Sequence, residues 1–343
     1  MATDSGVLQR VRRSLQSLRQ AAGLRVDAVP VVIAAFSGGA DSLALVILLK
    51  DLERLGLLRL VAVHVDHGVR PGSDQEAQTV AMVAGRLEVA FRAERIGDGN
   101  LARHTGVGVE EAMRRERYRI LADAAADLGA DAIATGHHRR DHAETVLLHL
   151  MRGAGTHGAA GMREISAMTV PWWPDRNDVR GVTLWRPLLR EEPSALRALV
   201  EARHLPIVDD PSNRSEAYRR NAVRHRVLPL LETVVPGAEG NLAAFAERAA
   251  EDDEALDAIA RDALSGVGDR LPRIALAGAP VAIQRRMIRG WIVLRAPGVD
   301  LTADRTEAVR LLVERNEGGK AVEIGAGWSV RLEAGSAVVV PPR

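Results

Sequence analysis

One stretch of the chain decides the fold: Val31-Val32-Ile33-Ala34-Ala35-Phe36-Ser37-Gly38-Gly39-Ala40-Asp41-Ser42. Its first six residues are apolar without interruption, which is typical of a strand buried on both faces of a parallel sheet. The residues from Ser42 to Leu55 then follow a helical pattern. A strand that turns through glycines straight into a helix leaves unpaired backbone N–H groups at the positive end of the helix dipole. Such a turn predicts a phosphate-binding loop.

The loop itself narrows the kind of phosphate site. It has neither the lysine of a Walker loop nor the G-x-G-x-x-G pattern of dinucleotide-binding folds. It carries an acid, Asp41, and an acid beside phosphates is expected to act through a bridging divalent cation. We therefore predict that Ser37, Gly38, Gly39, Ala40, Asp41 and Ser42 bind phosphate, with Asp41 as the metal ligand. The alternative is that Ser37 and Ser42 only cap the helix and that the glycines only turn the chain.

The sequence on either side repeats the alternation of short apolar runs with helical patterns. Further strands are predicted at Leu60–Val65, Val89–Ile96 and Asp131–Thr135, and further helices at Ser73–Leu87, Glu110–Leu128 and Asp141–Leu150. This alternation predicts an α/β domain with a doubly wound, mostly parallel sheet, whose ligands bind at the carboxyl ends of the strands.

Length and charge divide the rest of the chain. The 343 residues favour more than one domain. Residues 231–270 hold three bases and ten acids (3 − 10 = −7), whereas residues 151–230 (13 − 9) and 271–343 (11 − 7) each carry +4. We predict an N-terminal helix over 1–28, the catalytic α/β domain over 29–226, an acidic helical connector over 227–270 and a small C-terminal α+β domain over 271–343, whose positive charge suits contact with a polyanionic partner. The acidic run at residues 251–254 is expected to be the solvated face of the connector.

The N-terminal segment is expected to be a packed helix. Val7, Leu8, Val11, Leu15 and Leu18 fall at helical spacing, and the segment lacks the apolar core and cleavage site of a secretion signal. No stretch reaches the length of a membrane span. A cytoplasmic location without membrane attachment is therefore expected.

Composition excludes several chemistries. The sequence has no cysteine, which excludes disulfides, iron–sulfur clusters, thiolate zinc sites and catalysis through a protein thiol. Lys50 and Lys320 are the only lysines among 46 basic residues. Anions must therefore be held by arginine, helix N-termini or backbone amides.

Three further blocks carry chemistry. His64-Val65-Asp66-His67-Gly68 ends the second strand; it fits a contact with adenine or ribose, while metal coordination is the alternative. Arg114 and Arg117 lie one turn apart on a predicted helix, spaced to clamp an anion or to form a solvated charged face.

The densest block runs from Thr135 to Thr145 and includes Gly136, His137, His138, Asp141, His142 and Glu144. Asp141 and Glu144 are one helical turn apart, so both carboxylates can face the cleft of the glycine loop, where they would orient an amine, accept its proton or hold magnesium. The clustered histidines leave a zinc site as an alternative, although their spacing differs from that of binuclear zinc hydrolases.

These blocks together resemble a known family. The S-G-G-x-D-S loop is similar to that of the PP-loop ATP pyrophosphatases, and the order of the other blocks resembles the lysidine synthetases among them. The matching segments are His64–Gly68, the E-x-A-x-R-x-x-R-Y element with Arg114 and Arg117, Gly136–Gly155, Arg186-Pro187-Leu188-Leu189, and Asp209–Asn213 followed by Arg219, Arg220, Asn221 and Arg224. They span about residues 30–230. Pro171-Trp172-Trp173-Pro174 matches nothing and is expected to be a packed loop.

The resemblance implies a reaction and a set of roles. ATP, with Mg²⁺, would activate the C2 oxygen of the wobble cytidine in an isoleucine tRNA with a CAU anticodon, and free L-lysine would then displace AMP. His64 and Gly136 would contact the nucleotide, Arg114 and Arg186 would hold anionic groups, and Asp141 with Glu144 would serve the lysine amine and the cytidine.

Two other classes of protein are alternatives to this interpretation. A thiolating or glutamine-dependent member of the same superfamily usually needs cysteine, which this chain lacks. A nucleotide-binding module without catalysis would not need Asp141, Glu144, Arg114 and Arg186 together. The sequence leaves the oligomeric state open, a homodimer included.

Overall fold

A computed structural model describes residues 2–66, 73–97, 99–168, 182–209, 219–296, 298–299, 301–316 and 318–342. The chain forms two compact units, Met1–Glu247 and Arg248–Arg343, each of which is described by itself. The predictions made for His67-Gly68, for the loop with Trp172 and Trp173, and for 210–213 lie outside the described residues. The domain boundaries proposed from the sequence stay predictions.

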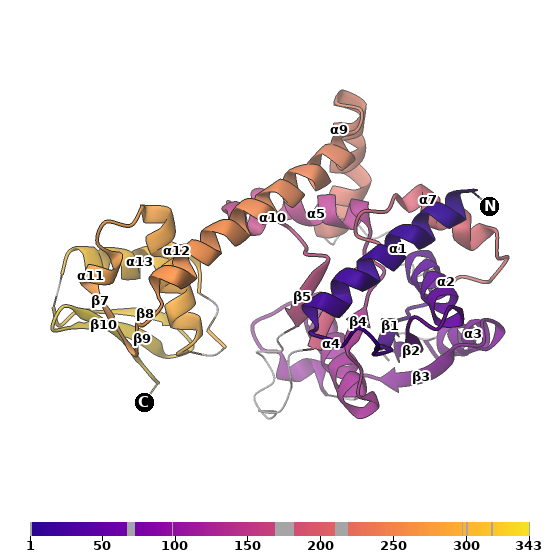
Figure 1. Cartoon of the computed structure of the whole chain (residues 1–343), viewed down its shortest axis with the longest axis horizontal. Coiled ribbons are helices and arrows are strands. Elements are labelled where there is room, and N and C mark those ends of the chain that lie inside the picture. Colours follow the sequence, from indigo (N-terminus) through magenta and orange to yellow (C-terminus); the bar gives the residue numbers. More distant parts are fainter. Residues whose placement is uncertain are drawn as a thin grey trace. The chain divides into compact units, whose positions relative to one another are not determined.

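The first unit is built on a six-stranded sheet (Figure 1). Its strand order is β3 (Ala90–Arg95), β2 (Arg59–Asp66), β1 (Val31–Ala35), β4 (Ala132–Ala134), β6 (Val182–Trp185) and β5 (Ile165–Met168). All neighbours run parallel except β5, which is antiparallel to β6. The predicted doubly wound, mostly parallel fold is confirmed, although the sequence analysis assigned no strand to the residues of β5 and β6.

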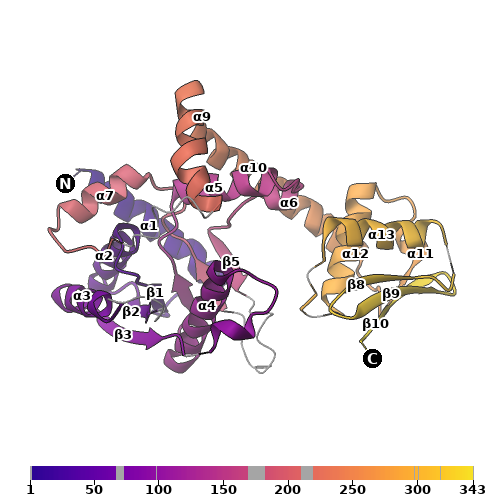
Figure 2. The ribbon, with the colours of Figure 1, turned by 180° about the vertical axis from the view of Figure 1, so that it is seen from behind.

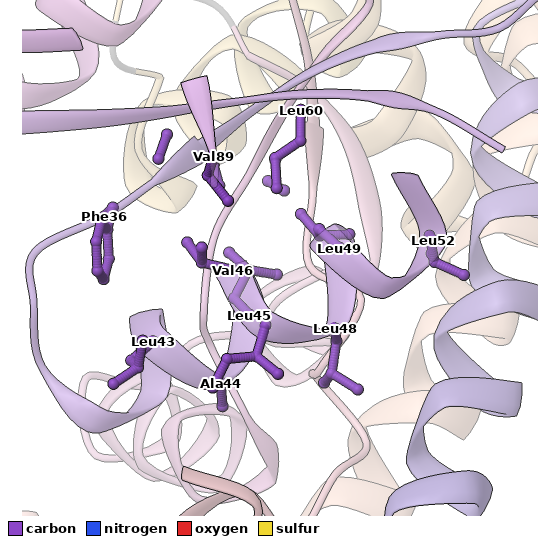
Figure 3. Close-up of a cluster of buried hydrophobic side chains, with 14 of the residues drawn as sticks. Phe36, Leu43, Ala44, Leu45, Val46, Leu48, Leu49, Leu52, Leu60 and Val89 are labelled. Carbon is purple, nitrogen blue, oxygen red and sulfur yellow. The ribbon is translucent and has the colours of Figure 1, made fainter. Parts of the chain in front are cut away.

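Both faces of β1 are buried, as its apolar run predicts. Val32 and Ala34 belong to a core with α2 (Ala40–Arg54), α3 (Ser73–Arg86), α7 (Pro193–Glu201) and α1 (Ala2–Ala21). Ile33, pointing the other way, belongs to a second core with α4 (Val109–Leu128). Figure 3 shows the first core, where Leu45, Val46 and Leu49 of α2 gather near Leu60 and Val89. The strand and the phosphate loop that follows it are therefore held from two sides.

The N-terminal helix is packed, as predicted. Val7, Val11, Leu15 and Leu18 are all buried in the first core, and Leu8 packs against it. The remaining elements of this unit are η1 (Leu101–Arg103), α5 (Arg139–Leu150), α6 (Thr156–Ala159), α8 (Arg219–Ala222), the π-helical turn η3 (Val223–Val227) and α9 (Leu228–Val234). In the described part of the chain, no helix has the length and apolarity that crossing a bilayer requires.

The boundary between the units falls inside α10 (Ala238–Ala263). Along its acidic run Glu251, Asp252 and Glu254 are exposed, as predicted. Asp253 is the exception, because it is buried and lies 2.8 Å from the guanidinium of Arg286.

The second unit has an antiparallel sheet with helices on one face (Figure 2). The strand order is β7 (Arg270–Pro272), β10 (Ser336–Val340), β9 (Trp328–Glu333) and β8 (Ala321–Gly325), covered by α11 (Arg273–Leu276), α12 (Val281–Val293) and α13 (Ala303–Glu314). Its core is formed around Trp291, Met287 and Val330. These elements match the small α+β domain expected from the sequence.

Candidate active site

The phosphate loop has the open geometry that the sequence predicts. Gly39 is the N-cap of α2 in an extended conformation, and within the described residues no side chain caps this helix end. Ser42 donates instead to the Gly39 carbonyl at 2.9 Å, and its hydroxyl lies 3.1 Å from that of Ser37. The serines therefore shape the loop, and the N–H groups at the start of α2 keep their capacity for an anion.

Two glycines are required by this geometry. Gly38 has φ +87, and a Cβ there would lie 2.7 Å from Val80 Cγ2 and 2.8 Å from Val208 Cγ2. A Cβ on Gly136, which follows β4, would lie 2.8 Å from the Asp41 carbonyl oxygen. Gly136 thus lets the end of β4 come directly against the start of α2.

A cavity of about 250 Å³ opens at these carboxyl ends of the strands. Asp41 reaches it with a half-exposed carboxylate, 51% accessible to solvent. The polar and charged residues that line this cavity are Ser37, Asp41, Ser42, Arg117, Tyr118, Thr135 and His137, together with the backbone of Gly136. One half-exposed carboxylate next to two hydroxyls and helix amides fits Mg²⁺, which prefers a few protein oxygens combined with substrate phosphates.

His64 lies beneath the loop. Its side chain is buried, and Nδ1 is 2.9 Å from the carbonyl oxygen of Phe36, the residue directly after β1. His64 is not among the residues that line the cavity. Its contact with the nucleotide stays a prediction, and the structure gives it a role in positioning the loop.

His138 connects the loop with the predicted acid pair. Its Nε2 is 3.5 Å from Asp41 Oδ2, and its Nδ1 is 3.3 Å from Asp141 Oδ2. His138 is also the N-cap of α5, in a capping box with Asp141. Burial alone would lower the pKa of His138, but the hydrogen bond to Asp41 and the charge of Asp141 outweigh it and raise that pKa.

His137 has the opposite electrostatic environment. Its Nδ1 is 2.8 Å from Thr135 Oγ1. Loss of hydration lowers the pKa of His137 to about 3, and the positive charges of Arg186, Arg220 and Arg117 act in the same direction against Asp141. The imidazole is therefore neutral near pH 7 and offers the cavity a hydrogen-bonding group without charge.

The acid pair is enclosed in a cluster of four charges, Asp141, Glu144, Arg220 and Arg224, which we call the acid–arginine cluster. Glu144 is fully buried; its carboxylate lies 2.6 Å from Arg224 Nε and 2.9 Å from Arg220 Nε. Asp141 Oδ1 is 2.7 Å from Arg224 Nη2 and 3.3 Å from Arg220 Nη2. Burial would raise the pKa of Asp141, but the charges of His138 and of these arginines hold it at about 2.

The predicted arginines have different surroundings. Arg114 is exposed and stacks over the Tyr118 ring at 5.2 Å, whereas Arg117, over the same ring at 5.5 Å, lines the cavity. Arg186 follows β6 and donates to the Arg163 carbonyl at 2.7 Å and to Ser166 Oγ at 3.1 Å. Burial lowers the pKa of Arg186, and the nearby charge of Arg114 acts in the same direction.

The predicted residues therefore fall into connected groups. Ser37, Asp41, Ser42 and Gly136 meet at the cavity, and Asp141 with Glu144 is linked to them through His138. The sequence analysis named four further residues that the structure places here but gave none of them a final role in the site: Arg117, His138, Arg220 and Arg224. Arg220 and Arg224 are one turn apart in sequence, a spacing that points both side chains to the same face of a helix.

Known proteins resemble this chain in sequence and in fold. The family model of a PP-loop domain matches residues 8–231, and that of a TilS substrate binding domain matches residues 271–337. A U34-tRNA thiolase from Methanococcus maripaludis has a similar fold, with a TM-score of 0.54 at 18% identity over 71% of this chain and 80% of its own. Fold, loop and domain match together define a PP-loop protein.

Relatives of similar length define the family more closely. A tRNA(Ile)-lysidine synthase of Streptomyces coelicolor is 36% identical over 90% of this chain and 85% of its own. One of Salinispora arenicola is 38% identical over 98% and 96%. One of Thermus thermophilus is 35% identical over 93% of this chain but only 59% of its own. The chain belongs to the tRNA(Ile)-lysidine synthase family, which confirms the resemblance found in its motifs.

Proposed function

We propose that this enzyme joins free L-lysine to C2 of the wobble cytidine in an isoleucine tRNA with a CAU anticodon, using ATP. The observation that carries the proposal is the continuous path from the uncapped phosphate loop through Asp41 and His138 to the acid pair on α5. It brings an ATP-binding loop and carboxylates for an amine to one edge of the sheet, and it agrees with the names of the relatives.

The first half of the reaction is an adenylation. The C2 oxygen of the cytidine attacks the α-phosphorus of ATP, the bond to the bridging oxygen breaks, and pyrophosphate leaves. The amides at the start of α2 and the hydroxyls of Ser37 and Ser42 hold the phosphates. Asp41 would hold Mg²⁺, which when bound would offset the negative charge of the phosphates. Arg114 and Arg186 hold anionic groups of the substrate or the intermediate, and Arg117 adds a guanidinium in the cavity.

The second half is a displacement by the amine of lysine. The ammonium first gives up one proton, because a protonated nitrogen has no lone pair with which to attack. The amine nitrogen then attacks C2, the bond from C2 to the adenylated oxygen breaks, AMP leaves, and the nitrogen gives up a second proton. The low pKa of Asp141 suits it to hold the ammonium, which leaves Glu144 to take the proton. Because both carboxylates already contact Arg220 and Arg224, the incoming ammonium must share or displace an arginine.

Labelled lysine gives the direct test. Purified protein is incubated with ATP, isotope-labelled lysine and an isoleucine tRNA transcript. The tRNA is then digested, and the masses of its nucleosides are measured by mass spectrometry. We expect one cytidine per tRNA to gain the mass of lysine less water, and a methionine tRNA with the same anticodon to stay unmodified. Omitting lysine should still allow tRNA-dependent release of pyrophosphate. Release that does not depend on tRNA would contradict adenylation of a base. Because the proposed substrates are tRNA, ATP and free lysine, we propose that the enzyme acts in the cytoplasm.

A further inference from the structure

The first unit has a second cavity, which shares only Arg186 with the residues given a role in the proposed reaction. Its volume is about 200 Å³, and it lies between α1 and the segment that follows β6. Its charged lining consists of four arginines, Arg10, Arg13, Arg186 and Arg190, and two glutamates, Glu164 and Glu191. Four arginines against two glutamates give this small space an excess of positive charge.

The ion pairs around the cavity leave part of that charge without a counterion. Arg10 uses both oxygens of Glu191, at 2.6 Å each, and Arg190 pairs with Glu247 at 2.9 Å. Glu164 accepts a hydrogen bond from Ser14. Arg13 has no ion pair or hydrogen bond with any residue that the structure describes, and the buried Nε of Arg186 likewise has no acceptor among the described residues. Two guanidinium groups therefore retain donors for an external anion.

Arg186 lines only the second cavity but also lies near the first. It comes directly after β6, the strand beside β4, and Gly136 lies at the corresponding end of β4. Its charge lowers the pKa of His137, which lines the first cavity. A ligand that fills only the first cavity leaves Arg13 unused. A chain of phosphodiesters places negative charge at regular steps, and is the kind of anion that reaches both.

We propose that the second cavity binds a backbone phosphate of the RNA substrate close to the nucleotide that is modified, with Arg13 and Arg186 as donors. The inference rests on the proposed function, since it assumes RNA as the substrate. Guanidinium groups suit this task because their planar donors match the oxygens of a phosphate. Such contacts position a nucleic acid without reading its sequence.

The chain provides a matched control for the test. Arg12 and Arg13 are adjacent on α1, both are exposed, and only Arg13 lines the cavity. We compare Arg13→Gln with Arg12→Gln by fluorescence anisotropy, using a labelled unmodified tRNA transcript at a series of salt concentrations. Arg13→Gln should weaken binding about fivefold and reduce the salt slope of log K by about one, the change expected for one lost phosphate contact. Arg12→Gln should stay within about twofold of the wild-type affinity.

Each other result overturns the proposal. Equal losses in the two variants would mean that α1 contributes only general charge. Unchanged tRNA affinity together with a raised KM for ATP in Arg13→Gln would assign the cavity to a phosphate of the nucleotide. Unchanged values of both, or a wild-type protein that does not bind tRNA, would leave the cavity without this ligand. The binding comparison involves no reaction, so a wild-type protein that binds tRNA but incorporates no lysine would refute the proposed function alone.

Discussion

The phosphate loop and the acid–arginine cluster lie along one path of contacts, but their charges are satisfied in different ways. Asp41 is half exposed, and the ionisable side chain that lies against it among the described residues is His138, at 3.5 Å. Glu144 is fully buried, and both of its oxygens contact arginines. The loop is therefore prepared for a ligand from outside, whereas the cluster is already neutralised by the protein itself.

Because of this difference, substitutions in the two regions should affect different quantities, namely turnover for the loop and stability as well for the cluster. Removing a charge from the loop takes away a contact that forms only with substrate, so it should affect turnover and leave folding intact. Removing a charge from the cluster leaves a partner uncompensated in a poorly hydrated place, so it should also affect stability. The following substitutions test whether the loop affects turnover alone and whether the cluster also affects stability.

Asp41→Asn should lower tRNA-dependent release of pyrophosphate by about a hundredfold or more, which corresponds to ~3 kcal/mol, because it removes the carboxylate that we propose as the Mg²⁺ ligand beside the phosphates. Unfolding by urea should stay within about 0.5 kcal/mol of the wild type, since the side chain is half exposed. A variant that keeps full activity would contradict the metal role. One that loses stability instead would show that Asp41 holds the loop together.

Glu144→Ala should reduce the free energy of unfolding by about 3 kcal/mol, at the lower end for a broken buried ion pair because Arg220 and Arg224 remain a quarter to a third exposed. The measurement is urea unfolding monitored by circular dichroism. In the double variant Glu144→Ala/Arg224→Ala the loss should be smaller than the sum of the two single losses, because the second change removes the unpaired charge. Additive losses would show that the pair is not coupled.

The same contrast explains what the sequence could predict. The loop is built from consecutive residues: an apolar strand, two glycines and a helix start, so its conformation and its ligand follow from local rules. The arginines of the cluster are 76 and 80 residues away from Glu144 in sequence. Nothing in the local pattern of Asp141 and Glu144 shows that guanidinium groups will cover them, because only the tertiary fold brings α5 against α8 and η3.

Short elements and long-range packing were missed for a related reason. The four residues of β6 are too few to show a period, yet Trp185 is fully buried there and donates to Ser14 of α1 at 2.8 Å. Arg114 and Arg117 are equivalent in spacing, and only the rotation of α4 decides that Arg117 lines the cavity. The spacing therefore identified the helix face that bears both arginines, but not which of the two lines the cavity.

Acid should destabilise the cluster through Asp141. The pKa of this carboxyl falls from 3.8 to about 2 on folding, which contributes about 2 kcal/mol of stability. A lowered folded-state pKa means that this contribution is complete above about pH 4 and is lost as the pH falls toward 2. Urea unfolding of the wild type and of Asp141→Asn at pH 5 and at pH 2.5 isolates it: the difference between the two proteins should shrink in acid. A difference independent of pH would mean that Asp141 is not held ionised by its neighbours.

The smallest effect concerns His138, the residue that joins the two regions. His138→Asn should keep the cap of α5, since asparagine is a good N-cap residue. The asparagine side chain is shorter than that of histidine, so it should lose the contact with Asp41. Stability should change by less than about 0.5 kcal/mol, while the KM for ATP should rise about fivefold, equivalent to ~1 kcal/mol. His138→Ala, which loses the cap as well, should show the same rise in KM and an additional stability loss of about 1 kcal/mol. If asparagine restored both quantities to their wild-type values, His138 would be only a helix cap, and the loop and the cluster would act independently.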